Sequence, residues 1–435
     1  MKRVENTRRV ENTRRIENIR RVADVRWLLI GLLIAALFAA ECVAVHAFFA
    51  TRFLGGNDFY SRWAGARALL LEGRDPYSPE VTAEIQVVKG IDPSRQGKGS
   101  FAYPLYILFF FWPLVYLPYD WAYAIWIVTL QWVTVATVIE LLRLGQWRPS
   151  PIGLAGLCLG TLFLYPVSRT IILGQFTLHI VLFLVAALLA LRRGRDGWAG
   201  VWLAAASIKP QMLVFVVPWL LVWALGQRRH WRLLKGLLAG GGALALAALA
   251  LFPRWPISFV EDVLRYSKVA GGRNPLMVLV GFLWPGGPSV VLSTLRYGLA
   301  GLLMLAMLAA WRRGWRECGE RFVYATYWAI VVSLLVPFQT GTTSQVMLLV
   351  PLLAWLRGAL ERWRRWKVLA GAGGLLAALW LLFLVTFQST ATRAKGEKPV
   401  MFLALPLLSL AVLVGIEIHR SHSPSPSLHG GEELP

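Results

Sequence analysis

A single carboxylate, Asp58, is the first candidate for chemistry in the sequence. It precedes a segment in which apolar residues recur at i, i+4, i+7 and i+11, the spacing of one helical face: Phe59, Trp63, Ala66 and Leu70. A carboxylate at the start of such a helix, beside the membrane surface, can act as a general base. It can also be the helix N-cap, for which Asp is a preferred residue. On spacing alone, the N-cap is the favoured interpretation.

Lys209 is a second candidate, because it lies inside an apolar run at residues 198–225. A cation in such a position is costly and often functional. As a point charge it could bind a phosphate group. A lysine that snorkels to an interface beside the break at Pro210 is an equally good interpretation.

A metal or nucleotide cofactor has no support in the sequence. Glu41 and His46 are five residues apart, so a helix would set them about 140° apart, which disfavours a facing metal pair. The chain has no GxxxxGK[ST], no GxGxxG at a strand–helix turn and no HExxH. We therefore predict neither a cofactor nor a bound metal.

The elements that carry these residues must be membrane helices. Of the 435 residues, 57% are hydrophobic and only 16% are charged, whereas soluble domains have roughly 25% charged residues. Apolar runs long enough to cross a bilayer recur between residues 27 and 418. This excludes a soluble enzyme, a secreted disulfide scaffold and a disordered protein, and predicts an all-α polytopic membrane protein with about 11–13 transmembrane helices.

The net charge of +22 could indicate nucleic-acid binding, but the basic residues lie in short loops between apolar runs. We therefore interpret the charge as the positive-inside signal that orients the helices. The predicted organisation is a basic cytoplasmic tail (1–26), a membrane domain (27–418) and a polar cytoplasmic tail (419–435). The polar stretch 51–100 is then the first external loop and carries interfacial helices. We expect no nucleic-acid partner.

The order of crossings between residues 103 and 225 has two solutions. If the basic segment 192–197 is inside, three crossings must connect it to residue 100, yet the sequence has four apolar runs there. If it is outside, the positive-inside rule fails at this point. A helix broken at Lys209–Pro210 would suit the first solution, because proline interrupts helices.

Four segments in order resemble glycosyltransferase family 87: NDFYSRWAGARALLLEGRDPYSP, FAYPLYILFFFWPLVYLP, LGQFTLHIVLFLVAALLALRRGRD and LAAASIKPQMLVFVVPWLL. The resemblance implies the GT-C fold, with an active site at the outer face and an essential acid in the first external loop. Asp58 matches that acid, which reverses the preference for a plain N-cap. The resemblance also implies that Gln175, Lys209 and Asn274 lie near the donor or the acceptor.

Three further residues complete the predicted substrate-binding set. Arg62 is a second cation for a departing phosphate, Tyr103 offers a ring that could stack on a sugar, and Gln345 lies in the late motif. The sequence departs from the family pattern at Thr177, where Asn is usual, at Asn274, where a longer external motif is reduced, and at Ser344–Gln345, where a His often begins the motif. These departures bear on the acceptor.

The resemblance to this family, which contains membrane mannosyltransferases that use polyprenyl-phosphate mannose, implies transfer of a sugar, mannose or another hexose, from a polyprenyl-phosphate donor to a lipid or glycan acceptor; with one candidate carboxylate, we expect inversion. The predicted location is the external face of the plasma membrane, among membrane lipids. The alternative is a transporter or lipid flippase with Lys209, Glu41 and His46 on the substrate path. The long external loop that carries Asp58 favours the transferase, because a transporter does not need it.

Overall fold

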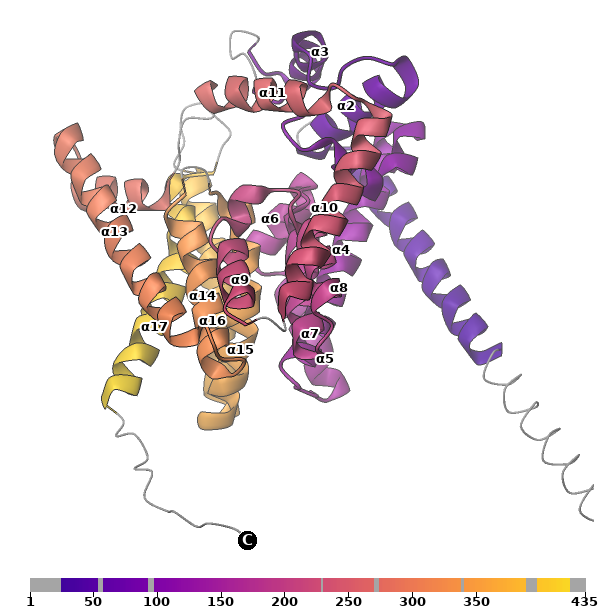
Figure 1. Cartoon of the computed structure of the whole chain (residues 1–435). Coiled ribbons are helices and arrows are strands. Elements are labelled where there is room, and N and C mark those ends of the chain that lie inside the picture. The colour runs from indigo at the N-terminus through magenta and orange to yellow at the C-terminus, as the bar shows by residue number, and fades with distance from the viewer. Residues whose placement is uncertain are drawn as a thin grey trace, which may run out of the picture.

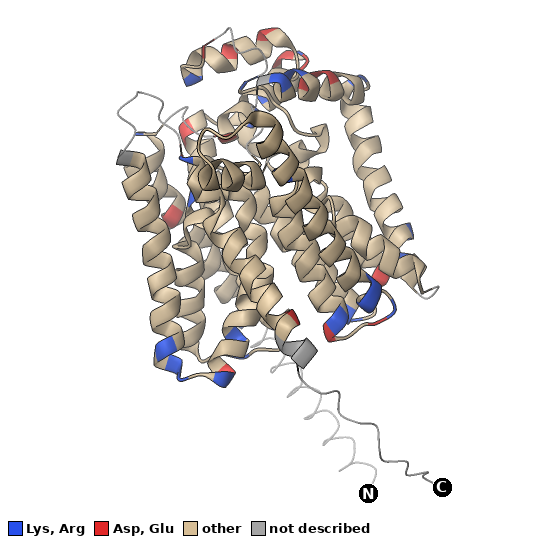
Figure 2. Ribbon diagram, turned by 90° about the vertical axis from the view of Figure 1, so that its left-hand side faces the viewer, with Lys and Arg blue, Asp and Glu red and all other residues tan. Residues whose placement is uncertain are grey.

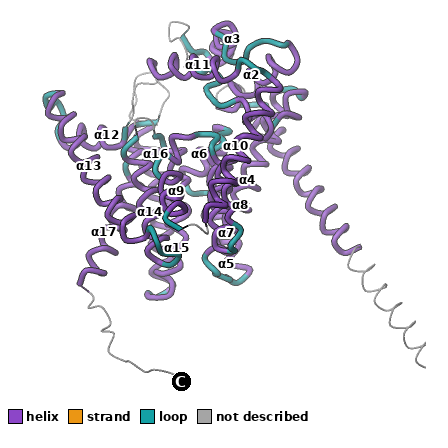
Figure 3. The backbone as a smooth tube through the Cα atoms, viewed as in Figure 1, coloured by secondary structure: helices purple, strands orange, loops and turns teal. Residues whose placement is uncertain are grey.

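A computed structural model describes residues 25–53, 58–92, 98–227, 230–269, 274–337, 340–388 and 397–422. Within these ranges the chain forms helices and loops and no strand (Figure 3). The predicted all-α polytopic fold is confirmed. Residues 1–24 and 423–435, most of the two predicted tails, lie outside the described residues.

The first helix is Val25–Ala50, and its last turn is a π-helix, His46–Ala50. The α-helices that follow are α2 (Asp58–Glu72), α3 (Pro79–Lys89), α4 (Tyr119–Leu144), α5 (Pro151–Leu162), α6 (Tyr165–Leu173), α7 (Thr177–Arg192), α8 (Asp196–Ala206), α9 (Val216–Leu225), α10 (Trp231–Leu251), α11 (Trp255–Val269), α12 (Pro275–Leu283), α13 (Ser289–Gly314), α14 (Glu320–Leu335), α15 (Leu349–Arg362), α16 (Arg365–Gln388) and α17 (Ala404–His422). Short 3₁₀ helices are η2 (Leu105–Phe110), η3 (Trp112–Tyr116), η4 (Pro210–Leu213), η6 (Thr342–Leu348) and η7 (Pro399–Phe402).

Seven of the described helices are long and apolar enough to cross a membrane, or eight if the bent pair α5–α6 counts as one span. That number is below the predicted 11–13. The difference arises partly because this count takes only long helices: α7 and α9 are apolar but shorter, although α7 still runs between the two ends of the bundle. The apolar windows of the first helix, α13 and α16 are each only 6% buried in protein, so these helices present most of their surface to lipid.

Helices α2, α3 and α11 lie at one end of the molecule, which we call the site end (Figure 1). The opposite end, the basic end, holds the loops that leave α4, α7 and α15. There, Arg192 donates a hydrogen bond to the carbonyl of Leu144, and Arg357 donates one to the carbonyl of Gly145. Charged residues concentrate toward these two ends of the ribbon, and few lie between them (Figure 2).

The early half of the chain follows the first of the two predicted solutions. Residues 103–118 do not cross the bundle, because they form the short helices η2 and η3 at the site end. Three passes, namely α4, the α5–α6 pair bent by 62° and α7, then bring the chain to the basic end at Arg192. The basic segment 192–197 therefore lies at the same end as the basic segments 230–235 and 357–367.

The break at Lys209–Pro210 is confirmed, and it turns one apolar run into a hairpin. Helix α8 ends at Ala206, η4 starts at Pro210, and α9 returns toward the basic end. At that end His230 Nδ1 lies 2.7 Å from an oxygen of Asp196, the first residue of α8. The ring of His230 also stacks on that of Trp223 of α9, with 4.2 Å between the ring centres. His230 therefore holds the start of α8 close to the end of α9.

Glycines bring α8 into backbone contact with α10. A Cβ at Gly200 would lie 2.1 Å from the carbonyl oxygen of Leu233, and one at Gly236 would lie 1.9 Å from that of Gly197. Gly236 and Gly240 have the GxxxG spacing that lets membrane helices approach closely. Any larger residue at Gly200 or Gly236 would push the hairpin away from α10.

Candidate active site

Helix α2 has the buried face that its sequence predicts. Phe59, Trp63 and Ala66 are buried. The ring of Phe59 stacks on Trp126 of α4 at 5.0 Å, and Trp63 Nε1 donates a hydrogen bond of 3.0 Å to the carbonyl of Leu114. Protein rather than lipid therefore covers this face, and it fixes Asp58, the first residue of α2, in the positive field of the helix N-terminus.

A glycine turn brings Gln175 to Asp58. Gly174 follows α6 with φ +68°, a conformation that favours glycine, and a Cβ there would lie 2.6 Å from the Cβ of Phe59. Trp126 Nε1 donates a 2.9 Å hydrogen bond to the carbonyl of Gly174 and holds the turn. Only a residue without a side chain lets the α6–α7 connection pass so close to α2.

Three predicted site residues from separate segments meet at this point. Gln175 Nε2 donates to Oδ2 of Asp58 at 2.5 Å, and Lys209 Nζ donates to Oε1 of Gln175 at 3.3 Å. All three side chains are half-buried. The carboxylate, the amide and the ammonium thus form one continuous chain of hydrogen bonds.

Arg62 belongs to the same cluster, and Tyr103 supports it. Arg62 Nη1 donates to the backbone carbonyl of Asp58 at 2.9 Å, and its guanidinium lies 4.4 Å from the centre of the Tyr103 ring. Tyr103 is only 5% exposed, and its ring centre lies 5.8 Å from that of Phe176. Its ring is therefore occupied by Arg62 and the core, which leaves little of it for the predicted stacking on a sugar.

Two residues at this site were missed by the sequence analysis. Lys89, the last residue of α3, extends its ammonium to within 3.3 Å of Ser61 Oγ on α2. Tyr266 of α11 lies close enough to Arg62, Asp58 and Tyr103 for their charges to act on its hydroxyl. Helix patterning gives no signal for either residue, because Lys89 reaches the site through the packing of α3 against α2, and Tyr266 through the contacts that hold α11 across the site end.

The pKa of the Asp58 carboxyl lies below its ordinary value. Burial alone would raise this pKa, but the positive charges of Lys89 and Arg62, the hydrogen bond from Gln175 and the charge of Lys209 together outweigh burial. Asp58 is therefore ionised at neutral pH and able to accept a proton, as a general base requires.

Helix α11 is fixed across the site end by three polar contacts to the segment that contains α2 and α3. Asp262, which is fully buried, accepts a 2.9 Å hydrogen bond from the backbone N–H of Ala102. The other two contacts join Ser258 Oγ to Asp75 Oδ2 at 2.7 Å and Arg265 Nη2 to the carbonyl of Tyr77 at 2.5 Å. These contacts set where Tyr266 lies.

Asn274 and Gln345 have other partners. Asn274 is the N-cap of α12, accepting from the backbone N–H of Met277 at 3.1 Å, and its amide donates to the carbonyls of Val336 and Pro337. Gln345 donates to the carbonyl of Met401 at 3.0 Å.

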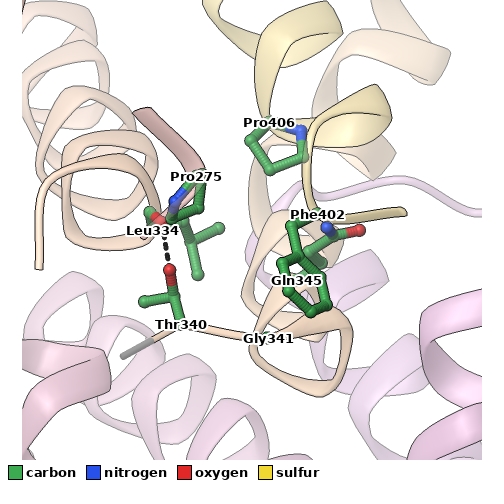
Figure 4. Close-up of a pocket in the computed structure, with 7 residues that line it drawn as sticks. All are labelled: Pro275, Leu334, Thr340, Gly341, Gln345, Phe402 and Pro406. Atoms are coloured by element: carbon green, nitrogen blue, oxygen red, sulfur yellow. Dashed lines mark hydrogen bonds between the residues drawn. The ribbon is translucent and has the colours of Figure 1, made fainter. Parts of the chain in front are cut away.

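Gln345 also lines a recess between α12, α14, η6 and α17 (Figure 4). The recess is too narrow for a water molecule, so it is no substrate cavity. Among the described residues, no hydrogen bond joins Asn274 or Gln345 to Asp58.

Glu41 and His46, the polar residues of the first helix, have separate partners. Glu41 accepts a 2.8 Å hydrogen bond from Trp132 Nε1, and His46 Nε2 lies 2.8 Å from Asp120. Within the described ranges, no group of three or more His, Cys, Asp or Glu side chains is arranged to hold a metal ion.

A family model for glycosyltransferase family 87 matches residues 101–337, more than half of the chain. The chain belongs to glycosyltransferase family 87. No curated protein and no solved structure matches it. Membership in family 87 makes the protein a membrane glycosyltransferase and disfavours the transporter alternative. The matched segment includes Gln175 and Lys209 but begins after Asp58, so the argument for Asp58 rests on its geometry.

Proposed function

We propose that this family 87 enzyme transfers a hexose from a polyprenyl-phosphate donor to a lipid or glycan acceptor, with inversion at the anomeric carbon. The observation that carries the proposal is the chain of hydrogen bonds from Asp58 through Gln175 to Lys209. It sets an ionised carboxylate and a lysine a short distance apart, with an amide between them. Such a pair can serve a transfer reaction, with the carboxylate as base for the acceptor and the lysine as cation for the leaving phosphate.

In this reaction Asp58 removes the proton from an acceptor hydroxyl, and the hydroxyl oxygen attacks the anomeric carbon of the donor. The bond from that carbon to the phosphate oxygen breaks, and the electron pair stays on the phosphate. A retaining route by covalent catalysis would need a second carboxylate as nucleophile. Among the described residues, the groups that act on the Asp58 carboxylate are three cations and one amide, which favours the single displacement.

A lipid-linked donor suits this site because the site lies at the end of the bundle opposite the basic end. By the positive-inside rule the basic end faces the cytoplasm, so the site end faces outward. Nucleotide sugars are made in the cytosol and would not reach it, whereas a polyprenyl phosphate can present its sugar on the outer face. We extend the proposal accordingly to the external face of the plasma membrane.

The test is a transfer assay with purified protein in detergent, a synthetic polyprenyl-phosphate mannose labelled in the sugar, and a membrane-lipid extract as acceptor. We expect labelled product and free polyprenyl phosphate in equal amounts. A transporter would give neither, because transport needs two compartments. Turnover of a nucleotide sugar in place of the lipid donor would refute the proposed donor while leaving the family assignment intact.

A further inference from the structure

A third cation at the site has no role in the reaction as described so far. Arg62 comes from α2, Lys209 from the α8–α9 hairpin and Lys89 from the end of α3. We propose that Lys89 binds the phosphate that leaves with the lipid, and that it acts together with Arg62 and Lys209. This inference rests on the proposed function and adds a phosphate-binding residue to it.

The local structure turns the Lys89 ammonium inward. Helix α3 ends at Lys89, and the next residue, Gly90, takes a left-handed conformation with φ +59° and donates its N–H to the carbonyls of Gln86 and Val87. A lysine in the last turn of a helix usually remains near the helix carbonyls and solvent. Lys89 instead reaches across to the hydroxyl of Ser61, a buried residue one turn after Asp58.

The Lys89 ammonium has N–H donors that remain available to a ligand. A lysine carries three N–H donors, and the hydrogen bond to Ser61 Oγ uses one of them. Burial lowers the pKa of Lys89, while the negative charge of Asp58 raises it and the charges of Arg62 and Lys98 lower it. An anion that arrives at this site would relieve the repulsion among the cations.

The charge of the site matches the product better than the substrate. Three cations around one carboxylate leave two positive charges in excess. The phosphodiester of a polyprenyl-phosphate sugar carries one negative charge, whereas the phosphate monoester that leaves carries about −1.5 to −2 near neutral pH. Attraction therefore grows while the carbon–oxygen bond breaks, and an interaction that is stronger in the transition state than in the ground state accelerates the reaction.

The experiment measures binding of a synthetic polyprenyl phosphate, the leaving group, and of the intact polyprenyl-phosphate sugar to detergent-purified enzyme. The variants are Lys89→Met and Lys89→Arg, and the matched control is Lys268→Met, an exposed lysine in the last turn of α11. We expect Lys89→Met to weaken binding of the polyprenyl phosphate about ten- to a hundredfold, the range of a charge-assisted hydrogen bond. Binding of the donor should weaken less, Lys89→Arg should keep most of the affinity, and Lys268→Met should match the wild type.

Two outcomes separate this inference from the proposed function. If the wild type binds the polyprenyl phosphate and Lys89→Met binds it equally well, the inference about Lys89 is wrong and the proposed function stands. If the wild type binds neither lipid, both are wrong. An effect of Lys89→Met confined to the pH profile, with unchanged phosphate affinity, would also overturn the inference, because Lys89 would then act only through Asp58.

Discussion

Replacing Asp58 by Asn separates its chemical role from its structural one. The amide oxygen of Asn can still accept the hydrogen bond that Gln175 Nε2 donates at 2.5 Å, but it cannot take a proton as a base. A general base contributes ~10²–10⁴-fold, which corresponds to about 2.7–5.4 kcal/mol of barrier. Loss of the half-buried charge beside Arg62 and Lys89 leaves these cations without their carboxylate partner, so some loss of stability should accompany the loss of turnover.

The sign of the stability effect follows from the lowered pKa of Asp58. The folded protein favours the ionised carboxylate, so the loss of stability in Asp58→Asn is present at neutral pH. It should vanish as the pH falls through the folded-state pKa, where the wild-type carboxyl is itself neutral. Turnover, in contrast, should remain low at every pH.

The assay compares turnover of the labelled lipid donor and thermal stability in the same preparations. Asp120→Asn is the matched control, because Asp120 is also a first-turn aspartate, on α4, with one side-chain partner, His46. We expect Asp120→Asn to keep wild-type turnover, whereas Asp58→Asn loses at least about a hundredfold. If Asp58→Asn keeps more than about a tenth of the wild-type rate, the general-base argument is wrong and Asp58 serves the helix start instead.

Three further predictions concern the pH profile, the packing and the orientation. Gln175→Leu removes a hydrogen bond that favours the ionised carboxylate and so helps to lower the pKa of Asp58, and the acid limb of kcat/KM should therefore move to higher pH; an unmoved limb would contradict this. Gly236→Ala should destabilise the protein by about 1–3 kcal/mol, because its Cβ would overlap a carbonyl oxygen of α8, whereas the control Gly241→Ala, with open space around it, should be neutral or stabilising in thermal unfolding. A membrane-impermeant thiol reagent on intact cells should label Val87→Cys, which replaces a side chain that is 74% exposed on α3, and should spare the exposed native Cys318 at the basic end; labelling of Cys318 alone would reverse the orientation.

Much of the fold and part of the site could be predicted from local sequence. The buried face of α2 follows from the spacing of its apolar residues, and the break at Lys209 follows from the proline beside it. Residues 103–118 show the limit of such reasoning, because an apolar run of this length fits a crossing as well as the short helices η2 and η3. Only packing against the other helices decides between a crossing and short helices. Because residues 103–118 do not cross, three passes connect the site end to Arg192.

The missing site residues have the same physical origin. Lys89 and Tyr266 are ordinary surface types in their own helices. They reach the site only when α3 packs against α2 and α11 is held across the site end. Asn274 has a capping role that its position before Pro275 permits but does not require. Sequence patterns describe one helix at a time, whereas these contacts depend on several.

The glycine contact between α8 and α10 has a consequence for the biogenesis of the enzyme. Helix α8 has 11 residues and α9 has 10, and a helix needs about 20 to cross a bilayer, so neither can insert as an independent span. Their stable place is against α10, which the ribosome makes later. We expect the insertion machinery to hold the hairpin, with Lys209 at its tip, until α10 has entered the membrane. The proposed catalytic centre would therefore be completed by the arrival of α10, a helix with no side chain among the residues that we assign to it.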